Sequence, residues 1–187
     1  MSINILVVTT ANRTRRFKQE SIDDINHLLD SLKRSAHFFS GKPLIIGSAG
    51  QTDVFSSSSI ACVELETNQD LESYIPGAQN LSITALTEEE AISPFEGGVV
   101  GESFTARIDF YFQGGHVINT LVEGERKAAL AERLMNLTSI LERPVIFYRL
   151  PQGGIGMLNP QAMTRVVITP GVPDLPRDAW SATPVLV

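Results

Sequence analysis

The chain has few of the residues on which stapled or metal-bound folds depend. It holds one cysteine, Cys62, and three histidines among 187 residues. One cysteine cannot form an intrachain disulfide, and the three histidines lack the spacing of metal ligands. We therefore predict no metal and no cofactor, and we interpret Cys62 as a buried, inert thiol within a strand. Unpaired cysteine favours a reducing compartment, which predicts a cytoplasmic protein.

Long apolar runs are also absent. No stretch approaches the roughly 20 apolar residues that cross a bilayer. The N-terminal run from Ile3 to Val8 is short and has no basic region before it, so it does not resemble a signal peptide. We expect no membrane interaction.

Positive charge is scarce in the middle of the chain. Residues 43–125 carry one basic and thirteen acidic side chains, a net charge of −12, whereas residues 1–42 and 126–187 carry +3 each. The acidic middle would repel nucleic acid, and the overall pI of about 5.1 argues in the same direction. The charge pattern is also compatible with scatter over a solvated surface.

The first third of the chain alternates between strand patterns and one amphipathic helix. Ser21 is typical of a helix N-cap, with Asp23 and Asp24 in the first turn, and the helix should end near Lys33 and Arg34. Apolar residues follow Ser21 at helical spacing. Strand patterns cover residues 3–10, 13–18, 44–46, 52–55 and 60–66.

The same order of elements returns about 103 residues later. Phe55 to Glu66 can be laid on Leu158 to Thr169 without a gap, and Ile60 and Val63 then coincide with Met163 and Val166. The second set comprises strands at residues 106–112, 116–122, 145–148, 155–158 and 163–169 and a helix at 125–140.

This recurrence predicts an α+β fold built from two pseudo-repeats of a β-β-α-β-β-β unit, with mainly antiparallel sheets. The expected organisation is a first unit at 1–75, an acidic connecting segment at 76–103, and a second unit with a C-terminal tail at 104–187. Within the connecting segment, residues 81–86 alternate like a strand, and Thr87 to Glu90 form a capping box. We expect this segment to pack on the surface, with Gly97 and Gly98 as a flexible turn. The alternative is that any two α+β stretches look alike when only the order and pattern of their elements are compared.

The strongest unusual feature is a basic strand that contains Arg13, Arg15, Arg16 and Lys18. Strand alternation places Arg13 and Arg15 on one face and Arg16 and Lys18 on the other. Four clustered cations suit an anionic ligand or an acidic partner. They are also typical of an edge strand that charge protects from aggregation, which is a common device.

Other motifs are weaker evidence for a function. The serines at 56–59 lack the context of a nucleophile elbow and are typical of a turn or a short helix start. The glycine-rich loops at 47–50 and 153–156 each lie between two strands, whereas a phosphate loop must lead into a helix.

The leading functional hypothesis is a non-enzymatic binding or interaction protein. It would be a bacterial or phage accessory protein that binds a protein partner or a small anionic ligand at the junction of the two repeats, through Arg13, Arg15, Arg16 and Lys18. One alternative is an enzyme whose site is assembled from scattered residues such as Arg15, His116 and Glu90. Another is a nucleic-acid binder that uses the basic strand. A homodimer is left open, because open sheet edges invite pairing.

Overall fold

The computed structural model describes residues 2–34, 38–75, 81–125, 140–171 and 175–184. These residues form a mixed α+β fold that is mostly strand. The helices are α1 (Ile22–Leu32) and the short α2 (Glu88–Ile92). The strands are β1 (Ile3–Thr9), β2 (Thr14–Gln19), β3 (Leu44–Gly47), β4 (Thr52–Phe55), β5 (Ile60–Glu66), β6 (Leu81–Ala85), β7 (Gly98–Val100), β8 (Ser103–Phe112), β9 (Val117–Glu125), β10 (Ile146–Arg149), β11 (Gly154–Leu158) and β12 (Met163–Thr169).

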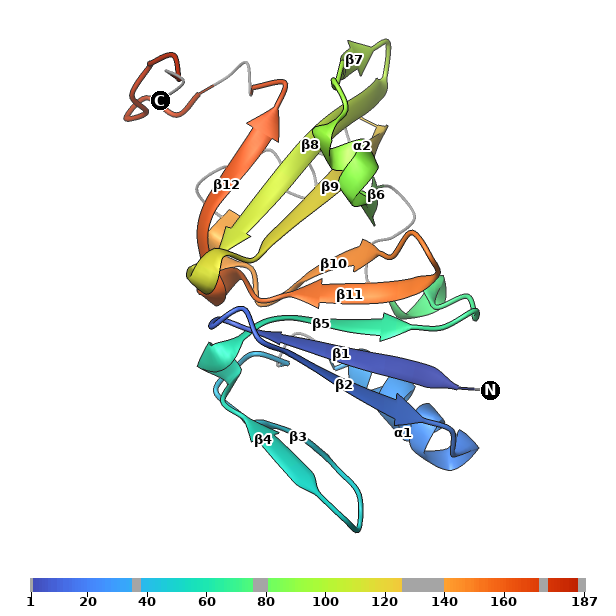
Figure 1. Cartoon of the computed structure of the whole chain (residues 1–187). Helices are drawn as coiled ribbons and strands as arrows, with labels where there is room; N and C mark the ends of the chain where they lie inside the picture. Colours follow the sequence, from blue (N-terminus) through green and yellow to red (C-terminus); the bar gives the residue numbers. More distant parts are fainter. Residues whose placement is uncertain (1, 35–37, 76–80, 126–139, 172–174, 185–187) are drawn as a thin grey trace.

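One ten-stranded sheet runs through both halves of the chain (Figure 1). Its strand order is β12-β8-β9-β6-β10-β11-β5-β1-β2, with β7 pairing β8, while β3 and β4 form a separate two-stranded sheet. The neighbours pair antiparallel except β10 and β6, which are parallel. The sheet is therefore mainly antiparallel, as predicted, but it is continuous rather than divided between two units.

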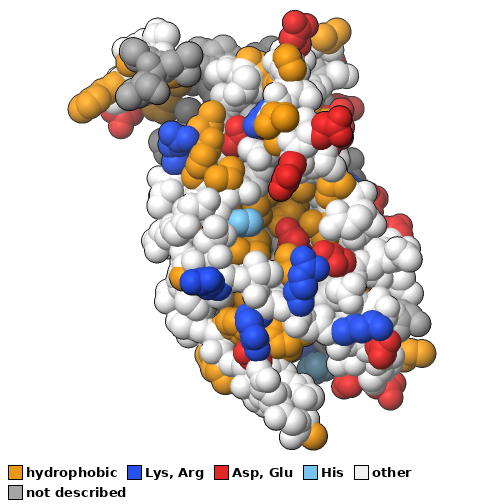
Figure 2. All heavy atoms as spheres, in the orientation of Figure 1, with side chains coloured by type: hydrophobic (Ala, Val, Ile, Leu, Met, Phe, Trp, Pro, Cys, Tyr) orange, Lys and Arg blue, Asp and Glu red, His pale blue; other side chains and the backbone are white. Residues whose placement is uncertain are grey.

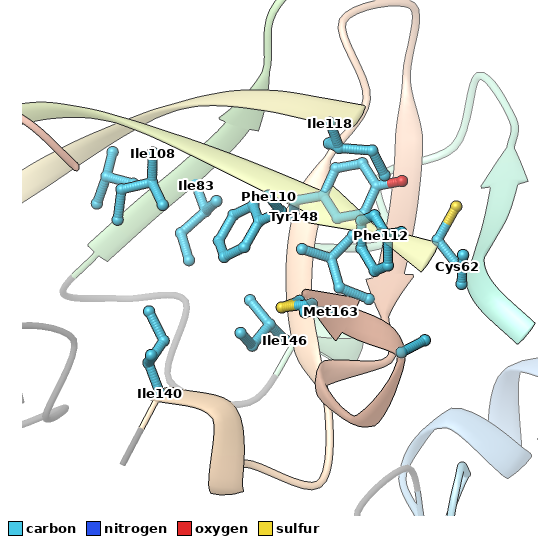
Figure 3. Packing of buried hydrophobic residues seen from close by; sticks show 14 of the residues in the cluster. Cys62, Ile83, Ile108, Phe110, Phe112, Ile118, Ile140, Ile146, Tyr148 and Met163 are labelled. Carbon is cyan, nitrogen blue, oxygen red and sulfur yellow. The ribbon is translucent and has the colours of Figure 1, made fainter. Parts of the chain in front are cut away.

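Two hydrophobic clusters hold this sheet together. The first lies against α1, where Ile25, Leu29 and Leu32 meet apolar side chains of β1, β5 and β11. The second gathers side chains from β5, β8, β9, β10 and β12, including Cys62, Phe110 and Tyr148 (Figure 3). Because β5 and the β10–β11 hairpin contribute to both clusters, they join the two halves of the core.

The helix predicted after Ser21 forms as α1. The Ser21 side chain accepts a hydrogen bond from the Asp24 backbone N–H at 3.4 Å, so it is the N-cap. The helix ends at Leu32, slightly before the predicted Lys33 and Arg34. Leu28 is half-buried and Ile22 is exposed, so the buried stripe is narrower than the sequence predicts.

Most of the predicted strands form within one to three residues of the expected bounds. The helix predicted at residues 125–140 falls almost wholly in 126–139, outside the described residues. In the connecting segment the predicted strand and capping box form as β6 and the start of α2, but the position of the strand differs from prediction. Its strand β6 lies inside the sheet with Leu81 and Ile83 buried, because it fills the space between β9 and β10. Gly98, predicted as a flexible turn, begins β7 and pairs with Thr105.

The strand registers recur at a constant interval along the chain. Six residue pairs join β1 to β5, from Asn4 opposite Glu66 onward, and the six pairs between β8 and β12 are the same pairs moved 103 positions. Each ladder contains a bulge at the same place, which skips Ala61 in β5 and Thr164 in β12. The β1–β2 pairs recur in β8–β9 with the same shift.

The two hairpins have matching registers but different surroundings. Leu44 lies opposite Phe55 in β3–β4, and Ile146 lies opposite Leu158 in β10–β11, each followed by three further pairs. The β10–β11 hairpin is built into the large sheet, whereas β3–β4 projects from it at one end of the molecule (Figure 1). The duplication of a β-β-α-β-β-β unit therefore stays a prediction.

Candidate functional site

The basic strand forms β2, an edge of the large sheet. Among the described strands β2 pairs only with β1, where Arg15 lies opposite Val7 and Arg16 lies opposite Leu6. Val7 belongs to the cluster beneath α1 and Leu6 packs on the other cluster, so Arg15 and Arg16 occupy opposite faces of the sheet. Lys18 shares the face of Arg16. These three residues alternate as predicted.

Arg13 lies just before β2, in the turn that follows β1. Its carbonyl oxygen accepts a hydrogen bond from the Thr9 backbone N–H at 2.9 Å, which closes this turn. The side chain is exposed. Arg13 therefore contributes charge near the strand but does not occupy a strand position.

A groove of about 320 Å³ separates β2 from the β3–β4 hairpin. Arg15, Arg16 and Lys18 line it from the strand side. The opposite wall is formed by residues of the hairpin and its loop, namely Ile46, Gly47, Ser48, Gln51 and Asp53. The groove is thus open to solvent along an edge strand and carries more cations than acids.

The hairpin is held against β2 by two contacts across the groove. An Arg15 guanidinium nitrogen lies 3.2 Å from Oδ1 of Asp53, and the Gln51 amide donates to Oδ2 of the same carboxylate at 2.8 Å. The rings of Phe17 and Phe55 meet edge to face with centroids 6.2 Å apart. The apolar contact provides most of the attachment, because the half-exposed ion pair is screened by water.

The four cations differ in whether an acidic side chain of the protein already pairs with them. Arg15 is paired with Asp53, and Lys18 lies 2.6 Å from Glu20, whose pKa it lowers through a hydrogen bond and its charge. No acid within the described ranges lies at ion-pair distance from Arg13 or Arg16. The acidic run from Glu88 to Glu90 begins α2, where Glu90 accepts hydrogen bonds from Thr87. Arg16 is therefore the strand's most available cation.

A second groove of about 290 Å³ lies on the opposite face of β2. It is lined by Arg16, Lys18, Asn4, Leu6 and Glu66, together with Ile5 and Phe17. Arg16 and Lys18 therefore border hollows on both sides of the edge. Figure 2 shows Lys and Arg side chains gathered on this face over the half of the molecule that contains β1, β2 and β5.

In the second half of the chain, a strand occupies the place that corresponds to the first groove. β6 pairs with Thr120–Gly124 of β9 on one side, and its Thr84 pairs with Arg149 of β10 on the other. The positions with the same register in the first half are Phe17–Ser21 and Gly47. Phe17, Lys18, Gln19 and Gly47 all line the groove. The first half thus has a hollow where the second half has β6.

Tertiary structure also assembles a polar cluster that the sequence gave no reason to expect. The Tyr148 hydroxyl donates to Oε1 of Glu64 at 2.6 Å, and Cys62 Sγ lies 3.8 Å from Nε2 of His116. Burial raises the pKa of the Cys62 thiol far above its usual range and lowers the pKa of His116. A neutral, buried thiol is a poor nucleophile, so burial disfavours a nucleophile–base pair of this cysteine and histidine.

The scattered enzyme site is not assembled by any contact among the described residues. Arg15 pairs with Asp53, His116 contacts Cys62, and Glu90 closes the capping box of α2. Nor do three or more His, Cys, Asp or Glu side chains gather in the described ranges as a metal site would require.

Comparison with protein-family models, with curated proteins and with solved structures yields no match to this chain. In the part of the chain that the structure describes, no helix has the length and apolar character needed to cross a membrane.

Proposed function

We propose that this protein is a non-enzymatic binding protein that takes an extended acidic segment of a partner protein into the groove between β2 and the β3–β4 hairpin. The observation that carries the proposal is the strand β6, which occupies the corresponding slot between β9 and β10. The site lies within the first half of the chain, away from the β11–β5 pair where the halves meet.

The proposal draws on an interpretation of the chain as two diverged copies of one unit. The shared interval of 103 residues in the β1–β5 and β8–β12 ladders, bulges included, supports this interpretation. Two unrelated α+β stretches would have no reason to agree in both register and bulge. If the copies descend from one unit, a slot that accepts a strand in one copy has the backbone geometry to accept a strand in the other.

The chemistry of the groove defines the partner. The free edge of β2 offers backbone N–H and C=O groups, so an added strand would gain main-chain hydrogen bonds. Side chains of that strand would meet Arg15 on one face and Arg16 and Lys18 on the other. Acidic side chains on both faces of that strand would satisfy these cations, and an apolar side chain on the Arg15 face would contact Phe17.

A peptide-binding assay tests the proposal. The probe is a blocked, fluorescent peptide of about six residues with the repeat Glu-Glu-Val, which places glutamates on both faces of a strand. We expect saturable binding by fluorescence anisotropy, no binding of the lysine–valine peptide, and weaker binding at high salt. Methylating alternate backbone nitrogens of the peptide should abolish binding, because a strand partner needs those N–H groups.

The double variant Arg15→Gln with Arg16→Gln should weaken binding by at least about 100-fold, since each lost charge-assisted contact costs roughly 1.5–3 kcal/mol. The matched control is Arg34→Gln with Arg177→Gln, which removes the same charge from exposed sites elsewhere. Unchanged affinity in the Arg15 and Arg16 variant would leave only the edge-protection role.

Small anions at the same cations are the second candidate, favoured because no acid in the described part of the chain pairs with Arg16. In that case inorganic phosphate would bind with an affinity close to that of the peptide, and methylation of the peptide backbone would have no effect. Retention on heparin that survives this double substitution would instead indicate a nucleic-acid surface elsewhere.

A further inference from the structure

We infer that copies of this chain associate head to tail, with the β3–β4 hairpin of one copy adding to the free edge of β12 in the next. The inference concerns self-association and leaves the partner groove free. It shares with the proposed function only the correspondence between the two halves.

The pairing already exists once inside the chain. The β11 strand of the second hairpin pairs antiparallel with β5, from Gly154 opposite Glu66 to Leu158 opposite Cys62. By register, β4 corresponds to β11 and β12 corresponds to β5. Among the described strands, however, β4 pairs only with β3 and β12 pairs only with β8. The chain therefore presents both halves of the same interface, unpaired, on different parts of its surface.

Exposed apolar side chains mark these two surfaces. Ile45 and Val54 lie opposite each other on the outer face of the hairpin and are 61% and 64% exposed. The residue that corresponds to Val54 is Met157, which is fully buried against the cluster beneath α1. An apolar pair on a projecting hairpin is costly in water unless something covers it.

The apolar side chains of β12 are less well buried than those of the corresponding strand β5. Val63 and Leu65 of β5, a strand that β11 pairs with on its second edge, are each 2% exposed, whereas the corresponding Val166 and Ile168 are only partly buried. A hairpin added to β12 in the register of β11 on β5 would place Val54 opposite Val166 and Thr52 opposite Ile168. The exposed apolar residues of one surface would then cover those of the other.

The two surfaces lie far apart, so the association is heterologous. In Figure 1 the β3–β4 hairpin projects at one end of the molecule and β12 lies towards the other. A contact of this kind repeats, and it closes into a ring or extends as a filament according to the rotation between copies. The groove beside β2 meets the hairpin at Ile46 and Asp53, on one face, whereas the added contact uses the free backbone edge of β4 and the other face, which carries Val54. Both interactions can therefore occur together.

Cross-linking tests the register directly. We would mix the single variants Val54→Cys and Val166→Cys under mild oxidation, with buried Cys62 left in place. Directly opposite residues in an antiparallel pair lie within disulfide range, so the mixture should form a covalent dimer that neither variant forms alone. Val54→Cys mixed with Arg165→Cys is the matched control, because the side chain of residue 165 points to the other face. Equal cross-linking of the two mixtures, or none, would overturn the inference.

Solution mass provides the second measurement. In light scattering, the wild-type chain should have a mass above that of a monomer, and this mass should rise with protein concentration. Ile45→Lys with Val54→Lys should be monomeric and folded, because both side chains are exposed. Ile92→Lys with Val100→Lys, which changes two other exposed apolar residues, should associate like the wild type. A wild-type monomer at every concentration would overturn head-to-tail association while leaving peptide binding at β2 unaffected.

Discussion

The hydroxyl of Tyr148 on β10 reaches past the intervening strand β11 to donate a 2.6 Å hydrogen bond to Glu64 on β5. It can do so because Gly156 is the residue of β11 that lies opposite both. Without a side chain at Gly156, the Tyr148 ring lies flat across the strand. This contact ties the second half of the chain to the first within the buried core.

Tyr148→Phe should destabilise the protein by about 1.5–3 kcal/mol near neutral pH, because the Glu64 carboxylate loses its donor while it stays largely buried. Burial raises the pKa of Glu64 and the Tyr148 hydrogen bond opposes that rise. The cost should therefore shrink as pH falls through the raised pKa, where the carboxyl is protonated. Urea unfolding at pH 7 and pH 4 measures this difference, with Tyr74→Phe as control. An equal cost at both pH values would contradict the charged hydrogen bond.

Gly156→Ala should cost about 1–3 kcal/mol, because the added Cβ would overlap the Tyr148 ring. Gly171→Ala, whose Cβ would meet nothing within 4 Å, should cost little. If the clash with the ring is the cause, most of the cost should vanish when the alanine is introduced into a Tyr148→Ala background. The four free energies of unfolding, those of the wild type, the two single variants and the double variant, form a complete cycle, and additive effects would exclude this explanation.

Cys62 should resist thiol reagents in the native state. It is fully buried, and burial raises its pKa, so almost no thiolate is present at neutral pH. We expect negligible labelling by a colorimetric disulfide reagent under native conditions and one thiol per chain in denaturant. Labelling faster than global unfolding would show that β5 opens locally.

His116 should make the protein less stable in mild acid. Burial lowers its pKa below the ordinary value of 6.5, so the unfolded chain takes up a proton before the folded chain does. Stability is therefore fully present above about pH 6.5 and falls as pH drops towards the lowered pKa. His116→Gln should flatten this part of the melting-temperature profile between pH 7.5 and 5.5. His27→Gln, at an exposed position, should not. Glu64 contributes with the opposite sign but equally in both variants.

Local chemistry made much of the fold predictable from the sequence. The Ser21 cap, the Thr87–Glu90 capping box and the bounds of β5 and β12 depend on residues near one another in the chain, so their patterns survive without tertiary context. The alternation of Arg15 and Arg16 across β2 follows from strand geometry alone. The two-unit pattern also predicts that Leu28, Leu32, Val63, Leu134 and Val166 are buried. Leu32 and Val63 are buried, Leu28 and Val166 are half-buried, and Leu134 lies outside the described residues.

What the sequence determined by itself is the order of the elements and the position of the basic strand. Tertiary structure decided which strand each strand edge pairs with. Nothing local distinguishes the β10–β11 hairpin, which enters the sheet, from the β3–β4 hairpin, which stays outside it. Local sequence also does not reveal that β6 fills the slot between β9 and β10 while the corresponding slot beside β2 is a groove. Nor does it reveal the contact between Cys62 and His116. The physical reason is that backbone edges carry the same N–H and C=O groups whatever the sequence, so long-range packing selects their partners.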